Sequence, residues 1–269
     1  MISALLKFIA LLLLATAPCA FAVAPATVFL EDLTWTELRD EVHSGKTTII
    51  VPIGGTEQNG PHMALGKHNA RVKALAQKIA RELGDALVAP VIAYAPEGSV
   101  DPPTAHMRFP GTITIPDKTF ELVLESAARS FKLHGFRDIV FIGDHGGYQK
   151  DLQATAATLN REWAATPVRA HAIVEYYRAT TTAYADALRK RGFTADEIGT
   201  HAGVADTSLT LSLAPGMVRS DRLGSAPKPA ASDGVYGDPR RSSAEMGQLG
   251  ADAIVAATVA AIKQATARR

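Results

Sequence analysis

Cysteine is almost absent from this chain. The single cysteine among the 269 residues, Cys19, lies in an N-terminal segment that we expect to be removed. A mature chain without cysteine can form no disulfide and has no thiol nucleophile. Its stability must therefore come from a packed core, and its chemistry from other side chains.

The chain also lacks an excess of charge of either sign. Its 28 basic and 27 acidic residues give a formal net charge of +1, and 47% of the residues are hydrophobic. A balanced charge gives no bulk electrostatic attraction to nucleic acid or to an anionic membrane. We therefore expect a globular protein that does not bind nucleic acid.

Residues 1–22 differ in kind from the rest of the chain. Lys7 is their only charged residue, their apolar run FIALLLLATAP is short for a bilayer span, and residues 20–22 form the small-x-small pattern AFA. These are the features of a secretory signal peptide. We expect cleavage at its end, one domain over residues 23–269, a periplasmic or secreted location and no membrane contact afterwards. An uncleaved anchor and a lipoprotein through Cys19 are less favoured alternatives.

Apolar runs alternate with amphipathic segments along the mature chain. The runs predict strands over 47–54, 85–95, 137–144 and 168–177. Helical spacing and capping residues predict helices over 35–44, 69–83, 117–134, 148–165, 178–191 and 243–266, with a further helix inside 201–218. This alternation is typical of βαβ units and predicts a three-layer α/β/α sandwich with a mainly parallel sheet.

Carboxylate and imidazole side chains gather just after two of the predicted strands. The stretch TEQNGPHMALGKHN, residues 56–69, contains Glu57, His62 and His68, and His145 follows the strand over 137–144. Because the carboxyl ends of parallel strands face one crevice, these side chains can converge there. The alternative is that each histidine is an ordinary hydrogen-bonded loop residue, and for His62 we favour a structural or supporting role.

Glu57, His68 and His145 form a consistent ligand set for one ion. Two imidazoles and a carboxylate suit a catalytic Zn²⁺ with an open position for water. Mn²⁺, Fe²⁺ and Ni²⁺ accept the same ligands, so the metal is not fixed by ligand type. Such an ion would lower the pKa of bound water and polarise a carbonyl group.

Several collinear segments resemble motifs of the creatininase (creatinine amidohydrolase) family. The stretch over 56–69 resembles TEQHGPHLPLGTD, and FPGTITI (109–115) resembles FPGT with His106 before it. Further along the chain, GDHGG (143–147) resembles NGHGG, and HAGVADTSL (201–209) resembles HAG-x-x-ETSL. Near its end, GVYGDPRRSSAEMG (234–247) resembles the family's GDP segment. Together these segments extend over nearly the whole mature chain.

The resemblance implies a three-layer α/β fold, oligomers built from dimers, and hydrolysis of non-peptide carbon–nitrogen bonds, often of cyclic amides. It also implies two metal ions bridged by a water. Glu57 and His145 match ligands of the first metal. His201 matches a histidine at the substrate, which could carry a proton to the leaving nitrogen. Asp206 stands where the family has a glutamate; it could be a ligand, a supporting carboxylate, the general base or the N-cap of a helix that begins near Thr207.

The chain departs from the family pattern at three ligand positions. Asn59 replaces a histidine of the second metal, His68 replaces the bridging aspartate, and Gly147 replaces a glutamate ligand of creatininase. A carboxylate can bridge two cations, whereas a neutral imidazole has one lone pair and cannot. We therefore expect a site with one metal, held by Glu57, His68 and His145.

The leading hypothesis is an exported, metal-dependent hydrolase of a small amide, lactam or lactone, assembled as a homo-oligomer. Its substrate contacts are expected in the glycine- and proline-rich loops over 96–116 and 219–240. Two alternatives remain open: a binding protein that has lost turnover, and a metal-dependent isomerase or lyase acting on a small polar substrate.

Overall fold

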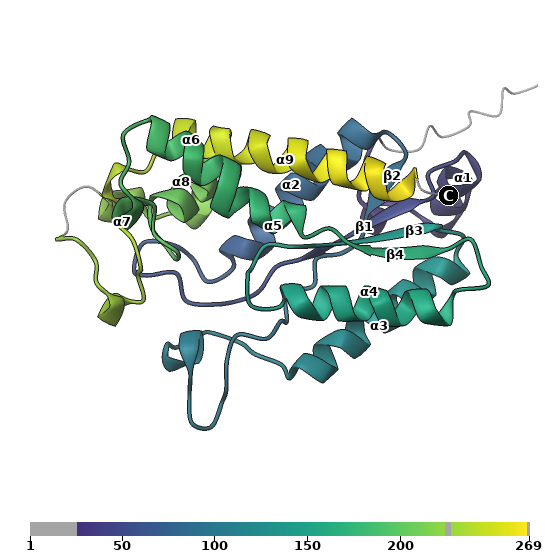
Figure 1. The fold of residues 1–269 in the computed structure, drawn as a ribbon, viewed down its shortest axis with the longest axis horizontal. Coiled ribbons are helices and arrows are strands. Elements are labelled where there is room, and N and C mark those ends of the chain that lie inside the picture. The colour runs from purple at the N-terminus through teal and green to yellow at the C-terminus, as the bar shows by residue number, and fades with distance from the viewer. Residues whose placement is uncertain (1–25, 224–226, 268–269) are drawn as a thin grey trace, which may run out of the picture.

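Four parallel strands form the sheet at the centre of the molecule. The computed structural model describes residues 26–223 and 227–267, so the predicted signal peptide over 1–22 lies outside the described residues. The sheet order is β2-β1-β3-β4 (Figure 1). The strands are β1 (Thr48–Ile53), β2 (Ala86–Val88), β3 (Asp138–Gly143) and β4 (Arg169–Ala172). The predicted α/β fold with a parallel sheet is confirmed.

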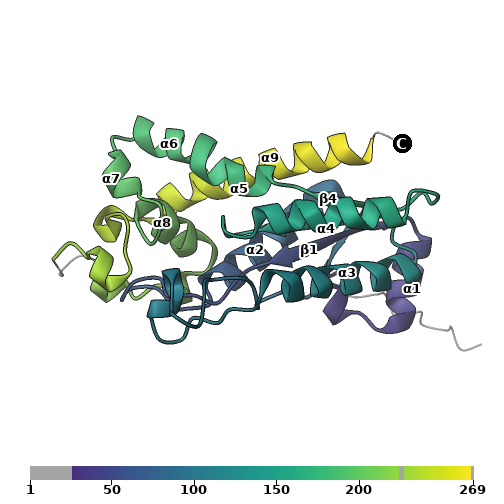
Figure 2. The same ribbon diagram turned by 60° about the horizontal axis from the view of Figure 1, so that its bottom comes forward.

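Helices cover both faces of this sheet. The helices are α1 (Trp35–His43), α2 (Lys67–Leu83), α3 (Asp117–Leu133), α4 (Gln149–Glu162), α5 (Glu175–Ala179), α6 (Ala185–Lys190), α7 (Ala195–Ile198), α8 (Val204–Leu213) and α9 (Ala244–Thr266). Helices α3 and α4 pack on one face, while α2, α5 and α9 pack on the other (Figures 1 and 2). A π-helical turn over Thr180–Tyr184 joins α5 to α6.

The core is divided in two by the sheet, as expected for strands whose side chains alternate between faces. Ile50 and Val140 point into the layer that contains α2 and α9. Their neighbours Ile49 and Ile139 point into the layer that contains α3 and α4. Both faces of β1 and β3 are thus buried, which explains why their sequences are continuous apolar runs instead of alternating ones.

Helix α9 is long and apolar enough to span a bilayer by length and composition. Among the described residues it is the one helix with these properties, and half of its most apolar window is buried inside the fold. Its buried side chains, such as Ile254 and Val259, belong to the same core layer as α2. The helix therefore serves as a core helix of the α/β domain.

Two predicted strands are shorter in the structure than in the sequence prediction. The predicted strand over 85–95 ends at Val88, because Pro90 provides no backbone N–H for a ladder and only the isolated bridge of Ile92 to Ile53 continues the pairing. The predicted strand over 168–177 was wrong at its end. The chain turns after Ala172, and residues 175–179 form α5.

Helix α2 also begins earlier than the predicted segment over 69–83. It starts at Lys67, so Lys67 and His68 occupy its first turn instead of the preceding loop. Helix α8 starts at Val204, with Gly203 at its N-cap position. Asp206 therefore lies inside the first turn of α8, and the N-cap alternative for this residue was wrong.

Candidate metal centre

The donor-rich segments meet at the carboxyl ends of β1 and β3. Glu57 follows β1 after the pair Gly54 and Gly55, and His145 follows β3. The long loop over 96–116 folds back over this edge and brings Glu97 and His106 to the same point. The site thus combines the two neighbouring strand ends expected for an open α/β sheet with a loop from outside them.

Four side chains form a compact group of metal donors, which we call the donor cluster: Glu57, Glu97, His106 and His145. One ligand atom from each lies within 4.8 Å of the others. His106 Nε2 lies 3.1 Å and His145 Nε2 lies 3.6 Å from Glu57 Oε2. His145 Nδ1 lies 3.7 Å from Glu97 Oε2. Two carboxylates and two imidazoles thus surround one small volume.

The carboxylates of the donor cluster have unsatisfied oxygen atoms. Glu57 Oε2 and both oxygens of Glu97 are buried without a hydrogen-bond partner among the described residues. Gly55 permits this arrangement, since a Cβ atom there would lie 2.4 Å from Glu97 Oε1, and its φ of +146° disfavours other residues. Buried carboxylate oxygens without donors are costly unless a cation approaches them.

Burial and the neighbouring charges shift the pKa values of the cluster in opposite directions. Burial raises the pKa of Glu97 to about 9, and the charge of Glu57 beside it adds to this effect. Burial also raises the pKa of Glu57, but His68 and Lys67 lower it more strongly, so that it lies well below its usual value. Burial lowers the pKa of His145 to about 4 and also lowers that of His106. Both imidazoles are therefore neutral near pH 7, as metal ligands must be.

The other oxygen of Glu57 belongs to a saturated network. His68 Nε2 lies 2.6 Å from Glu57 Oε1, and His68 Nδ1 lies 2.6 Å from Asp144 Oδ2. Arg71 donates to Asp144 Oδ2 at 2.6 Å, and the Tyr176 hydroxyl donates to Asp144 Oδ1 at 2.8 Å. The imidazole of His68 can donate to both carboxylates at once only when both nitrogens carry hydrogen. In this arrangement neither nitrogen offers a lone pair to an ion, and the ligand role predicted for His68 stays a prediction.

Lys67 and Asp206 extend this network on the same side of Glu57. The Lys67 ammonium group is fully buried, donates to Asp206 Oδ2 at 2.9 Å and lies 3.8 Å from Glu57 Oε1. Asp206 also accepts from Arg71 at 2.8 Å and from the amide of Ala202 at 2.9 Å. Burial raises the pKa of Asp206, but Lys67 and Arg71 lower it well below its usual value. The catalytic role predicted for Asp206 stays a prediction; its carboxylate is engaged by three donors.

His201 lies beside Glu57 with one ring nitrogen engaged. Its Nε2 lies 2.9 Å from the carbonyl oxygen of Gln58, while its Nδ1 lies 3.7 Å from Glu57 Oε1. With the proton on Nε2, the ring donates to that carbonyl and leaves Nδ1 as an acceptor, although the side-chain nitrogen of Gln58, itself a donor, also lies 3.1 Å from Nε2. Burial lowers the pKa of His201 to about 3, and the charge of Lys67 lowers it further. The ring is therefore a neutral imidazole, compatible with the predicted role in proton transfer.

Two residues of the opening stretch lie outside the donor cluster. The Asn59 side chain donates to the carbonyl oxygens of Glu57 at 2.8 Å and Ala64 at 3.0 Å, and so ties the loop together. His62 Nε2 lies 3.0 Å from the Thr207 hydroxyl. Both are buried; Asn59 holds the loop to itself, while His62 holds it against α8.

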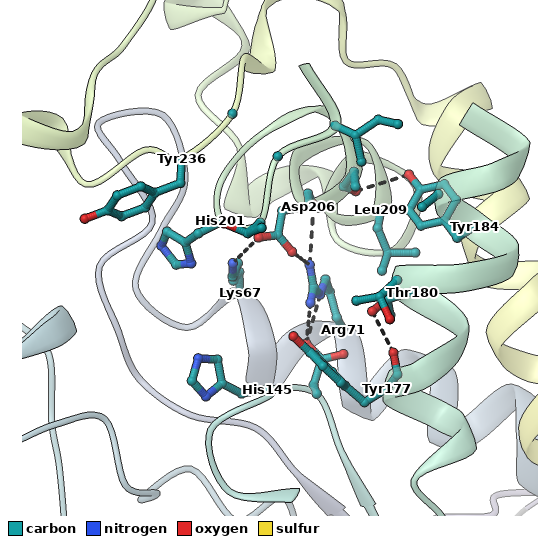
Figure 3. A pocket seen from close by; sticks show the side chains of 18 of the residues that line it. Lys67, Arg71, His145, Tyr177, Thr180, Tyr184, His201, Asp206, Leu209 and Tyr236 are labelled. Atoms are coloured by element: carbon teal, nitrogen blue, oxygen red, sulfur yellow. Dashed lines mark hydrogen bonds and ion pairs between the residues drawn. The ribbon is translucent and has the colours of Figure 1, made fainter. Parts of the chain in front are cut away.

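A cavity of about 910 Å³ opens over the donor cluster and the network. Figure 3 shows Lys67, Arg71, His145 and His201 around its inner part. Its outer part is formed by the π-helical turn, by α7 and by the loop before α9. The residues that line the cavity also include Tyr177 on α5, and Thr180, Thr181, Arg189, Lys228 and Tyr236. The cavity therefore leads from solvent to the donor cluster.

Sequence reasoning missed two members of the donor cluster. Glu97 and His106 come from the loop over 96–116, for which the sequence predicts substrate contacts but no metal donors. The signal that was present is composition, because this loop contains a single glutamate and a single histidine. Which way they point depends on the path of the loop, and no periodic pattern records that path.

Comparison with protein families identifies one match over most of the chain. The model of the family described as "Creatininase: Creatinine amidohydrolase" matches residues 31–262. A creatinine amidohydrolase of Pseudomonas putida is 27% identical over 206 residues, which is 73% of this chain and 76% of that protein. A mycofactocin precursor peptide peptidase of Mycolicibacterium smegmatis is 36% identical over 127 residues, which is 45% of this chain. That match spans 49% of the length of the peptidase.

Solved structures of creatininases share the fold. A crystal structure of creatinine amidohydrolase superimposes with a TM-score of 0.76 at 25% identity and covers 91% of this chain and all of that one. A manganese form of creatininase gives a TM-score of 0.75 at 25% identity over 89% of this chain and 98% of that one. A mutant creatininase in a Zn–Zn form gives 0.74 at 26% identity, with the same coverage of both chains. The names of these structures include zinc and manganese forms, so the comparison does not single out one metal.

Proposed function

This chain is a hydrolase of the creatininase family, whose model matches residues 31–262, and we propose that it uses one divalent metal ion to hydrolyse a carbon–nitrogen bond of a small molecule. The observation that carries the proposal is the donor cluster, with its three buried carboxylate oxygens that lack a hydrogen-bond partner among the described residues.

The donor set fits a metal ion on physical grounds. Glu57 and Glu97 place two carboxylates side by side in a buried site, which a nearby dication would stabilise. His106 and His145 are neutral imidazoles, each with one lone pair. Nδ1 of His145 accepts from the amide of Gly147 at 3.2 Å, so its Nε2 would take an ion only if the ring hydrogen moved to Nδ1 and that contact were given up. We propose that these four side chains hold the ion, with zinc the first choice and manganese, iron or nickel compatible with the ligands. Bound there, the ion would supply an activated water and polarise a carbonyl.

This ligand set differs from the one expected from the sequence. Glu57 and His145 are common to both, while Glu97 and His106 take the place given to His68. His68 instead orients Glu57, since it holds Oε1 and leaves Oε2 directed at the other donors. A histidine that fixes a ligand carboxylate is a usual supporting partner of a metal site.

The remaining polar residues suit hydrolysis of an amide. Nδ1 of His201 can accept a proton on the side of Glu57 and return it to a leaving nitrogen. Gln58 fixes the ring, because its carbonyl accepts from Nε2. Asp206 keeps Lys67 and Arg71 in place at the base of the cavity.

The cavity supports a substrate larger than one small ring. A volume of about 910 Å³ is at the upper end of small-molecule sites. We propose a cyclic amide that carries an extended arm, with the reacting group at the donor cluster; a related lactone, in which a carbon–oxygen bond would break, is the alternative within the panel. The second candidate is a peptide amide, favoured by the same volume and by the 36% identity to a protein named a peptidase. A panel of small lactams, lactones and short peptides separates the two.

The proposal is tested by metal content and turnover measured together. Purified mature protein is expected to bind one divalent ion per chain and to cleave at least one compound of the panel. His145→Ala should abolish both, while Glu121→Gln, which breaks only an ion pair with Lys118 on α3, should change neither. A protein with intact metal and no turnover on the panel would favour the binding-protein alternative. Oxygen from labelled water in the product would separate hydrolysis from an isomerase or lyase reaction.

Export and assembly are proposed with the same function. We propose a periplasmic or secreted location on the basis of the signal-peptide pattern in residues 1–22, and a homo-oligomer on the basis of the family resemblance. Sequencing the N-terminus of the exported protein and measuring its mass in solution test the two proposals separately.

A further inference from the structure

Tyr177 is a partly buried tyrosine whose hydroxyl does not help to hold the fold together. It lies on α5 and lines the cavity over the donor cluster (Figure 3). Its hydroxyl has no hydrogen-bond partner among the described residues, in contrast to the two other tyrosines nearby. Tyr176 donates to Asp144 at 2.8 Å, and Tyr184 donates to the carbonyl oxygen of Ala205 at 3.1 Å.

The glycine after His145 brings this hydroxyl close to the donor cluster. A Cβ atom on Gly146 would lie 2.7 Å from the Tyr177 hydroxyl oxygen, which is closer than real Cβ atoms approach. Gly146 therefore makes room for the tyrosine directly beside a member of the cluster. Burial raises the pKa of Tyr177, and Asp206 and Asp144 raise it further, so the hydroxyl keeps its proton and can act as a donor.

The helical conformation of α5 explains why Tyr177 and its neighbour have different roles. Successive residues of a helix are about 100° apart around its axis. Tyr176 therefore points into the core, while Tyr177 points into the cavity. The π-helical turn that follows contributes Thr180 and Thr181 to the same wall, and such turns occur frequently at functional sites.

We propose that the Tyr177 hydroxyl donates a hydrogen bond to the acyl oxygen of the substrate and to a carboxylate oxygen of the product acid. The inference rests on the proposed hydrolase, because amide hydrolysis creates such a carboxylate. It makes Tyr177 a substrate-contacting residue, with Gly146 as the residue that gives it access.

Acetate, the simplest carboxylate product of an amide, is a suitable probe. Its affinity for zinc-loaded protein is measured by calorimetry in the original chain and in Tyr177→Phe, which removes only the hydroxyl. We expect roughly five- to tenfold weaker acetate binding with unchanged zinc content, the loss typical of one neutral hydrogen bond. Tyr184→Phe is the matched control on the same wall, and its acetate affinity should stay within about twofold, since its hydroxyl is already bound to Ala205.

A second variant reaches the same hydroxyl from the other side. Gly146→Ala should displace the Tyr177 ring and weaken acetate binding by a similar factor. In the double variant with Tyr177→Phe the hydroxyl is already absent, so the alanine, which acts on acetate by displacing that hydroxyl, should add little further loss even though its Cβ would still lie 2.9 Å from the ring Cζ. On any panel amide that the enzyme cleaves, Tyr177→Phe should lower kcat/KM with zinc retained.

The inference is overturned if Tyr177→Phe binds acetate as tightly as the original chain, or if the effects of Gly146→Ala and Tyr177→Phe simply add. Failure of the original protein to take up zinc would instead reject the proposed hydrolase. The acetate comparison is then made on metal-free protein and judged by the same criteria.

Discussion

The two oxygens of Glu57 face surroundings of opposite kinds. Oε1 belongs to a network in which His68, Asp144, Arg71, Lys67 and Asp206 satisfy one another. Oε2 faces the donor cluster, where the buried oxygens of Glu97 have no partner among the described residues. The network is saturated by its own side chains, whereas the donor cluster contains buried carboxylate oxygens that lack a hydrogen-bond partner among the described residues. The comparison separates the residues of the network from those that we propose as ligands of an ion.

The largest effect is expected from breaking the network at its centre. Asp144→Ala removes the carboxylate that holds His68, Arg71 and Tyr176, and leaves a buried guanidinium short of a partner. The free energy of unfolding, measured in urea, should fall by about 3–5 kcal/mol. Asp186→Ala removes an exposed pair with Arg189 and should cost less than about 1 kcal/mol. Equal losses in the two variants would show that the network does not hold the fold.

Substitution in the donor cluster, unlike that in the network, should lower metal affinity and leave the stability of the metal-free protein nearly unchanged. Glu97→Gln keeps the shape of the side chain and removes its charge, so zinc affinity should fall at least about tenfold. Metal-free protein should lose little stability, because the protonated carboxyl group of Glu97 interacts with Glu57 and the amide of glutamine can donate to Glu57 in its place. Competition with a chromogenic chelator measures the affinity. An unchanged zinc affinity would remove Glu97 from the ligand set.

The pH dependence of the free energy of unfolding gives a second test of the difference between the network and the donor cluster. In metal-free protein Glu97 keeps its proton up to about pH 9, whereas the unfolded chain loses it near 4.5. The unfolded state therefore binds fewer protons in this window, and stability falls as pH rises. Between pH 7 and 9 the free energy of unfolding should fall relative to Glu97→Gln by up to about 1.4 kcal/mol per pH unit. The histidines with lowered pKa values do not titrate there. Parallel curves for the two proteins would contradict the shift.

The smallest effect concerns communication between the two sides of Glu57. Lys67→Met removes a positive charge that lies 3.8 Å from Oε1, so the carboxylate should bind a cation on Oε2 more strongly. Zinc affinity should rise about two- to fivefold, while Asp206 stays held by Arg71 and Ala202. Lys78→Met, at an exposed position of the same helix, is the control. Weaker zinc binding in Lys67→Met would mean that the ammonium builds the site instead of opposing the ion.

The sequence predicts the frame of this protein better than the inside of its site. The apolar runs of β1 and β3 predict buried parallel strands, and strand ends predict that Glu57 and His145 meet. The predicted end of the strand over 168–177 was wrong. Tyr176 and Tyr177 favour a strand by their intrinsic propensity, but in the structure they lie in helix α5 and pack against the core. Glu97 and His106 were missed because their directions depend on a loop of 21 residues, over 96–116, that has no periodic pattern. The sequence also does not show what surrounds His68. Its position after β1 suits a metal ligand, but in the structure one ring nitrogen lies beside the carboxylate of Glu57 and the other beside that of Asp144.

The central claim is that the Oε2 side of Glu57 holds a single ion while the Oε1 side remains a hydrogen-bonded network. Anomalous diffraction at the zinc edge, from crystals of the zinc-loaded protein, tests it directly. The account predicts one peak per chain at about 2.0–2.2 Å from Glu57, Glu97, His106 and His145, with His68 still between Glu57 and Asp144. A peak coordinated by His68, or two peaks bridged by one carboxylate, would contradict it.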